Sequence, residues 1–270
     1  MSSAHESRTK PRSSCTILYR THGGENRAPR PPWYSKEVCL RSLLTAVNRA
    51  NESLDVRFTV LYDGMLSMEP WDRTLRRLAE PRGEIVELGK TNNALSCLKA
   101  VQLASSLPDD ELVLLSEDDY LWLPVAVTEI VGALGSLPGD YVTGYDHPVR
   151  YQPDYSLGAD WEHWYTTIHI HGERHWRSQE STCMTFAATA LTLRQDYTYF
   201  DRYHDNGKNT PADRELFRHL CGLGAYRDVD TPRRLLLGPM PSLATHAHLP
   251  WLAPSVDWDA VAASVGRDLE

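Results

Sequence analysis

Apolar runs and helix-forming segments alternate from residue 15 to residue 140, and this alternation constrains the fold more than any other feature of the chain. Apolar runs predict strands at residues 15–21, 56–62, 84–88 and 111–115. Apolar residues at helical spacing predict helices at residues 33–51, 70–79, 92–107 and 124–137. Strands that alternate with helices favour a mostly parallel sheet with helices on both faces. We therefore expect an α/β fold with a Rossmann-like, mostly parallel central sheet flanked by helices.

The second half of the chain has a weaker pattern. It predicts strands at residues 141–144, 182–188 and 235–237 and helices at residues 188–196 and 210–220, separated by a polar loop at 201–209. In the last helix we expect Thr210 as the N-cap and Pro211 at the first helical position. We expect residues 1–14 to be a disordered tail, and residues 15–140 and 141–270 to be two halves of one domain.

Composition excludes several classes of protein. The 28 basic and 36 acidic residues give a net charge of −8, and 41% of the residues are hydrophobic, enough to bury a core. The acidic balance disfavours general nucleic-acid binding, and no apolar run is long enough to span a membrane. The five cysteines are widely spaced without a CxxC pair, and the basic N-terminus has no apolar signal segment, so we expect a cytoplasmic protein.

Polar residues end three of the predicted strands. Arg20–Thr21, Asp63 and Glu117–Asp119 each follow an apolar run, and strand ends of a parallel sheet meet at one edge, where such folds bind ligands. Three adjacent carboxylates repel one another unless a positive charge lies among them. A Mg²⁺ or Mn²⁺ ion that bridges phosphate groups would supply it. The alternative is a solvated acidic turn.

The triplet Glu117–Asp118–Asp119 resembles the DxD motif of the GT-A glycosyltransferases, and the order of elements over residues 15–250 is similar to theirs. The resemblance implies a GT-A-like fold, with residues 15–140 as the nucleotide-sugar-binding half and residues 141–270 as a smaller acceptor-binding and catalytic half. It implies that Asp119 binds the metal. The residues that it implies for the donor are Tyr19, Arg20, Thr21 and Asp63 for the base and ribose, Asn92 and Asn93 near the phosphates or sugar, and Glu117 and Asp118 for the ribose or donor sugar.

The resemblance also implies a catalytic base in the second half. Inverting members carry an acidic residue at the start of a late helix, and Asp213 is similar to it, with Glu215 as the alternative. Such a carboxylate accepts the proton of the acceptor hydroxyl as that hydroxyl attacks the donor. The alternative is that both residues are ordinary acids in a first helical turn.

Two groups of histidines call for an interpretation. His246, with His248 as the alternative, resembles the late histidine that many GT-A enzymes supply to the metal; otherwise both are surface residues of a loop. His169–Ile170–His171 lacks the glutamate of HExxH, which disfavours a catalytic zinc site. We expect Asp146, His147, Trp164 and His169 near the acceptor, with core packing as the alternative for the tryptophan.

The sequence therefore predicts a glycosyltransferase that depends on Mn²⁺ or Mg²⁺ and uses a UDP- or GDP-sugar as donor, inverting if Asp213 is the base. A nucleotidyltransferase is the first alternative, but the expected glycine-rich loop and lysine are missing after the first strand, where the chain reads His22–Gly23–Gly24. A non-catalytic nucleotide- or sugar-binding module is the second alternative. The residues do not identify the acceptor.

Overall fold

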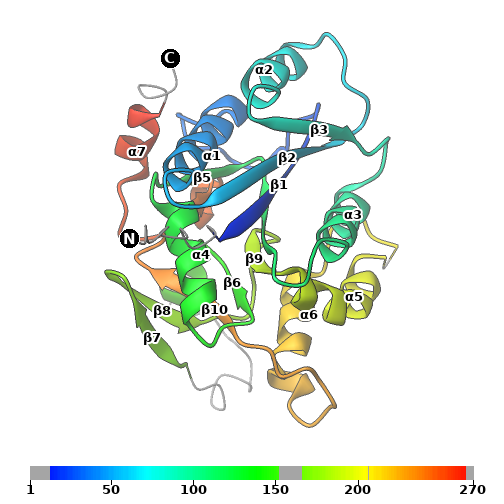
Figure 1. Ribbon diagram of the computed structural model, residues 1–270, viewed down its shortest axis with the longest axis vertical. Helices are drawn as coiled ribbons and strands as arrows, with labels where there is room; N and C mark the ends of the chain where they lie inside the picture. Colours follow the sequence, from blue (N-terminus) through cyan, green and yellow to red (C-terminus); the bar gives the residue numbers. More distant parts are fainter. Residues whose placement is uncertain (1–12, 152–165, 206, 266–270) are drawn as a thin grey trace, which may run out of the picture.

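The computed structural model of the protein describes residues 13–151, 166–205 and 207–265. Within them lies a nine-stranded sheet at the centre of the molecule (Figure 1). Its strands, in spatial order, are β3 (Gly83–Glu87), β2 (Asp55–Asp63), β1 (Ser14–His22), β4 (Leu112–Glu117), β9 (Phe186–Thr189), β6 (Tyr141–Val142), β10 (Leu236–Met240), β8 (Arg174–Ser178) and β7 (Ile168–His171).

Most of the strands run in one direction. The four strands β3, β2, β1 and β4 pair in parallel, and β6 pairs in parallel with β10. Only β9 and β8, among the described strands of this sheet, run against the others. The predicted α/β fold with a mostly parallel central sheet is thus confirmed.

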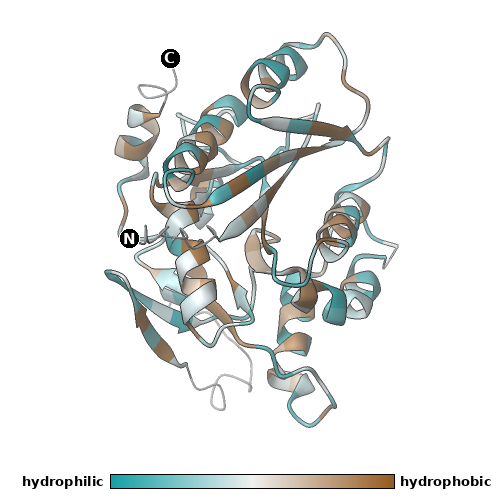
Figure 2. Ribbon diagram, in the orientation of Figure 1, coloured by the Kyte–Doolittle hydropathy of each residue, from teal (hydrophilic) through white to brown (hydrophobic). Residues whose placement is uncertain are grey.

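Helices cover both faces of the sheet (Figure 1). One face carries α1 (Lys36–Ala50), α2 (Pro70–Ala79), α4 (Ala126–Ser136) and α7 (Trp258–Ser264), and the other carries α3 (Asn93–Ser105), α5 (Ala190–His204) and α6 (Asp213–Leu220). Side chains alternate along β1, so Ile17 packs on the first face and Leu18 on the second. Figure 2 shows that the helices mix hydrophilic and hydrophobic residues, as helices with one buried face do.

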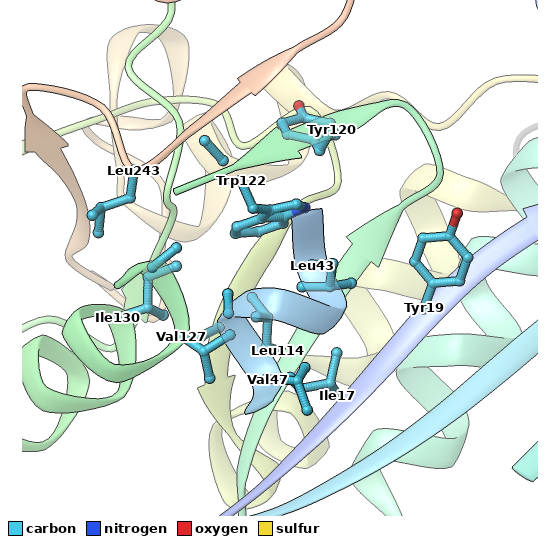
Figure 3. Close-up of a cluster of buried hydrophobic side chains, with 14 of the residues drawn as sticks. Ile17, Tyr19, Leu43, Val47, Leu114, Tyr120, Trp122, Val127, Ile130 and Leu243 are labelled. Carbon is cyan, nitrogen blue, oxygen red and sulfur yellow. The ribbon is translucent and has the colours of Figure 1, made fainter. Parts of the chain in front are cut away.

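A second, two-stranded sheet joins the middle of the chain to its last part. β5 (Tyr120–Trp122) pairs antiparallel with β11 (Ala244–His246), so that His246 lies opposite Tyr120. Trp122 anchors this sheet, because its side chain is buried beside Leu43 of α1 (Figure 3). Its backbone N–H donates to Ser42 Oγ at 3.0 Å. The predicted strands include neither β5 nor β11, because three residues are too few for a periodic pattern.

Several other boundaries differ from the prediction. Helix α5 extends to His204, through the start of the predicted polar loop at 201–209, and α7 was not predicted. The expected strand 182–188 begins only at Phe186, because Cys183 and Met184 adopt left-handed backbone angles with φ of 46° and 56°. Helix α6 begins at Asp213 with Ala212 at the N-cap, so the expected Thr210 cap is wrong.

Among the described residues no helix is both long and apolar enough to cross a membrane. All five cysteines are free thiols, and Cys15, Cys39 and Cys97 are buried in the core. They therefore act as small apolar residues there.

A glycine at the start of β3 allows this edge strand to approach β2. A Cβ atom on Gly83 would lie 1.7 Å from the carbonyl oxygen of Phe58, so Gly83→Ala has to push the two backbones apart. We expect this substitution to lower the free energy of unfolding in urea by about 2 kcal/mol. Gly135 in α4, where a Cβ would meet no atom within 4 Å, is the matched control, and Gly135→Ala should be neutral or stabilising. Equal stability of the two variants would contradict the prediction.

Candidate active site

A cleft of about 710 Å³ lies at the carboxyl ends of β1, β2 and β4. Its lining includes most of the residues that the sequence assigned to the donor, together with residues that it did not assign. The lining residues are Arg20, Thr21, His22, Asn26, Asp63, Thr91, Asn92, Asn93, Ser96, Glu117, Asp118, Asp119, Asn209, Thr210 and His246. Strand ends of the parallel part of the sheet thus form one site, as expected for such a sheet.

Each carboxylate of the Glu117–Asp119 triplet meets a basic side chain of the protein. Arg20 pairs with Glu117, Lys36 Nζ lies 2.9 Å from Asp118 Oδ2, and Arg30 Nη2 lies 3.0 Å from Asp119 Oδ2. Three basic side chains of the protein thus offset part of the repulsion for which the sequence analysis proposed a metal ion. Lys36 and Arg30, unlike Arg20, come from segments that the sequence pattern did not connect to the triplet.

Arg20 links the triplet to helix α3. Its Nη1 donates to Asn93 Oδ1 at 2.5 Å and to Ser96 Oγ at 2.9 Å, while Nη2 donates to Glu117. Burial raises the pKa of Glu117 to about 7, against the opposing effect of Arg20. Arg20 and Asn93, both predicted as donor residues, thus form one hydrogen-bonded wall of the cleft.

Lys36 is a buried lysine that the sequence analysis missed. It is the first residue of α1, its side chain is 3% exposed, and Nζ donates to the carbonyl oxygens of His22 at 2.7 Å and Gly24 at 2.5 Å. Thr21 Oγ1 also donates to Asp118 Oδ2, at 2.7 Å. A lysine in a first helical turn opposes the helix dipole, and this local conflict is the signal that could have identified it.

Asp119 and His246 face each other across the two-stranded sheet. His246 Nε2 lies 3.0 Å from Asp119 Oδ2, and the His246 ring stacks on Tyr120 with centroids 5.3 Å apart. Burial alone would raise the pKa of Asp119, but His246 and Arg30 hold it well below its ordinary value. Burial alone would lower the pKa of His246, but Asp119 raises it above 6.5.

The residues present fit a divalent cation that takes part of its ligands from a diphosphate. Asp119 Oδ1 is buried and has no hydrogen-bond partner, and His246 lies beside the same carboxylate. In the described part of the chain no group of three or more His, Cys, Asp or Glu side chains is arranged so that it could hold a metal ion by itself. Mg²⁺ commonly uses one or two carboxylates and completes its shell with phosphate oxygens and water.

His248, the alternative metal ligand, does not line the cleft. Its ring lies 5.8 Å from that of His246 and 6.3 Å from that of Trp251. Burial and the neighbouring His246 lower the pKa of His248. Of the two late histidines, the structure brings only His246 to Asp119.

Asp63 and Asn92 line the cleft and also have local partners. Asp63 Oδ1 accepts from the Thr91 N–H at 2.7 Å and from Thr91 Oγ1 at 2.9 Å, and Asn92 Oδ1 caps α3 by accepting from Leu95 N–H at 2.8 Å. Tyr19 does not line the cleft, because its buried ring packs on Phe58.

Asp213 lies outside the cleft lining, where it holds the loop at residues 181–184. Its carboxylate accepts hydrogen bonds from both hydroxyls and three backbone N–H groups of that loop, among them Thr182 Oγ1 at 2.7 Å and Cys183 N–H at 3.0 Å. Within residues 13–151, 166–205 and 207–265, these donors to Asp213 all come from the loop. Its role as base stays a prediction. Glu215 is exposed and also lies outside the lining.

Three of the residues expected near the acceptor, Asp146, His147 and His169, do not line the cleft either. Asp146 is 1% exposed and pairs with Arg177 and Tyr151. His147 packs between Tyr145 and Trp251, with ring centroids 5.3 and 5.1 Å away, and His169 lies on the edge strand β7. Trp164 lies outside the described residues.

Asn209 and Thr210 are cleft residues that the sequence analysis did not assign to the donor. They precede α6, and the Asn209 carbonyl oxygen accepts a hydrogen bond from Ala94 N–H at 3.2 Å, at the start of α3. This contact joins the second half of the chain to the predicted nucleotide-sugar-binding half. It depends on tertiary packing, so no local sequence signal marks it.

Comparison with known proteins gives similarity of structure only. No protein-family model and no curated protein matches the sequence. The galactosyltransferase LgtC, solved with donor and acceptor sugar analogues, is 11% identical, with a TM-score of 0.43 over 76% of this chain and 69% of its own. Glucosyl-3-phosphoglycerate synthase from Mycobacterium tuberculosis, solved with phosphoglyceric acid, is 10% identical, with a TM-score of 0.40 over 71% of this chain and 65% of its own.

A third structure is of 4-diphosphocytidyl-2C-methyl-D-erythritol synthase, 12% identical, with a TM-score of 0.39 over 70% of this chain and 81% of its own. Because all three TM-scores are below 0.5, the geometry of the cleft has to carry the assignment of function.

The hydrogen bonds to Asp213 predict a structural effect of its substitution. Asp213→Asn places an amide donor against groups that are themselves donors, so we expect the free energy of unfolding to fall by about 3 kcal/mol. Glu215→Gln, two residues away and exposed, should change it by less than about 0.5 kcal/mol. Urea unfolding measures both. Wild-type stability of Asp213→Asn together with lost activity would instead identify Asp213 as the base.

The partly buried His147 predicts a loss of stability in mild acid. Burial lowers the pKa of His147 from 6.5 to about 4. The unfolded chain therefore binds more protons below pH 6.5, and stability falls as the pH drops from 6.5 towards 4. We expect a contribution of up to about 2 kcal/mol between pH 7 and pH 5, measured by urea unfolding and absent in His147→Gln. An imidazole that titrates near pH 6.5 by NMR would contradict this.

Proposed function

We propose that the protein transfers a sugar from a nucleoside-diphosphate sugar to an acceptor hydroxyl, with Mn²⁺ or Mg²⁺ as cofactor. The observation that carries this proposal is the meeting of Asp119 and His246 in a cleft at the carboxyl ends of β1, β2 and β4. Asp119 and His246 lie more than a hundred positions apart in the chain. If the triplet were only a solvated acidic turn, it would not need a partner from so distant a segment.

The cation would be held by Asp119 Oδ1 and His246, and when bound it would neutralise the charge of the leaving diphosphate. Helix α3 begins at Asn93 in the wall of the same cleft, and a helix N-terminus favours phosphate. Asn92 and Ser96 add polar groups there. These features support a diphosphate between the triplet and α3.

The remaining assignments follow from the position of the cation. Asp63, at the end of β2, and Thr91, which is hydrogen-bonded to it, would face the base and ribose. Thr21 and Asp118, which are hydrogen-bonded to each other, line the same cleft. The acceptor would enter past Asn209 and Thr210. We keep a UDP- or GDP-sugar as the predicted donor and the cytoplasm as the predicted compartment.

Asp213 remains our candidate for the base of an inverting reaction. In that role its carboxylate has to exchange a hydrogen bond from the loop at residues 181–184 for one from the acceptor hydroxyl. The transfer function does not depend on this assignment, because the donor site is built from other residues.

A nucleotidyltransferase is the second candidate. Such an enzyme would need a lysine near the end of β1 to bind the triphosphate of its substrate. Lys36 is the basic residue bound to that end, but it already donates to the carbonyl oxygens of His22 and Gly24 and pairs with Asp118. These contacts favour a structural role for Lys36 over triphosphate binding, and this disfavours a nucleotidyltransferase relative to a sugar transferase.

The test is release of nucleotide from a panel of UDP- and GDP-sugars in the presence of Mn²⁺. We expect slow release of UDP or GDP from one donor, loss of that release with EDTA, and a fall of about 100-fold or more in Asp119→Asn. Asp109→Asn is the matched control, because Asp109 is an exposed acid that precedes β4 and pairs with Arg194.

Two other outcomes would contradict the proposal. Pyrophosphate release from a nucleoside triphosphate and a sugar phosphate would identify a nucleotidyltransferase. Failure to bind any nucleotide, with or without Mn²⁺, would exclude both the glycosyltransferase and the nucleotidyltransferase. A non-catalytic module that does not bind nucleotides would then remain.

A further inference from the structure

Arg30 occupies a position that the proposed transfer reaction does not explain. It belongs to the segment between β1 and α1, and its Nη1 donates to the carbonyl oxygen of Ala247 at 2.7 Å while Nη2 donates to Asp119 Oδ2 at 3.0 Å. Ala247 follows His246 directly, so a single guanidinium contacts both segments that would hold the cation. Its side chain is only 13% exposed.

The position of Arg30 is fixed by more than the ion pair. Its guanidinium lies over the Tyr34 ring, 4.3 Å from the centroid, and the neighbouring Pro29 accepts a hydrogen bond from Leu249 N–H at 2.9 Å. Two neighbouring residues of the segment, Pro29 and Arg30, are therefore hydrogen-bonded to residues 247–249. These contacts hold the Arg30 side chain in one position within the site, unlike a surface side chain that is free to move.

The two carboxylate oxygens of Asp119 have different surroundings. Oδ2 accepts from Arg30 and faces His246, whereas Oδ1 is buried without a partner and belongs to a residue that lines the cleft. A divalent cation on Oδ1 would therefore share one carboxylate with the positively charged guanidinium. Two like charges on one carboxylate repel each other, and the repulsion is strong because the site is largely buried.

We propose that Arg30 and the divalent cation compete for Asp119, so that Arg30 keeps the affinity for the cation low until a diphosphate contributes its own negative charge. This inference rests on the proposed cation site and adds a regulation of it. The protein alone would bind the cation weakly, and the nucleotide would strengthen that binding. Arg30, a residue outside the Glu117–Asp119 triplet, would thus make tight binding of the cation depend on the nucleotide.

The test measures binding of Mn²⁺ alone to the full chain, by the electron paramagnetic resonance signal of the free ion, and needs no turnover. Arg30→Gln should bind Mn²⁺ about tenfold more tightly than the wild type, which corresponds to about 1.4 kcal/mol. Arg30→Met, which keeps the apolar stem, should show the same gain. Arg27→Gln, which removes an exposed arginine from the same segment, is the matched control and should bind as the wild type does.

The double variant Arg30→Gln with Asp119→Asn should lose the gain, because the carboxylate for which both cations compete is gone. Cooperative thermal unfolding establishes that each variant is folded. Arg30→Gln and Arg30→Met that bind Mn²⁺ no more tightly than the wild type would overturn the role of Arg30.

Repeating the titration with UDP or GDP separates the two proposals. We expect the nucleotide to strengthen Mn²⁺ binding more in the wild type than in Arg30→Gln. Equal strengthening in both proteins would overturn the role of Arg30 but leave the metal-dependent function intact. Absence of Mn²⁺ binding in every variant, even with nucleotide, would overturn both.

Discussion

The cleft depends on the pairing of three adjacent carboxylates with three basic side chains. Glu117, Asp118 and Asp119 lie too close together to be buried as unpaired charges, and each one meets a cation from a different segment. Removing Arg30 would leave the buried charge of Asp119 without this partner, and breaking a buried ion pair typically costs about 3–5 kcal/mol. The ion pairs thus explain why β1, the start of α1 and the intervening segment all converge on the end of β4.

The small sheet of β5 and β11 gives the cleft its second constraint. Trp122 fixes β5 on α1 through core packing (Figure 3). The pairing of β5 with β11 then determines where His246 lies. The position of the histidine is therefore set by hydrophobic burial some residues away from it. Such support from rigid, packed elements is what holds a functional site in a defined geometry.

The sequence allowed the fold and one edge of the cleft to be predicted, but not the contacts between distant segments. Arg20, Asp63 and Glu117 follow from the rule that parallel strands end at one edge, and all three line the cleft. Lys36 and Arg30 could not be assigned because their partners are defined only by tertiary packing. The turn at Cys183 and Met184, which surrounds Asp213 with donors, uses left-handed angles that non-glycine residues rarely adopt, so local propensity does not predict it.

The pairing of β11 with β5 also has a consequence for how the protein is made. The central strands β1 to β4 belong to the first half of the chain, whereas His246 comes from a segment translated more than a hundred residues after Asp119. A nascent chain can therefore form its parallel strands well before its cleft is complete. Because His246 carries part of the site, the protein gains its full set of cleft residues only after this later segment has been synthesised.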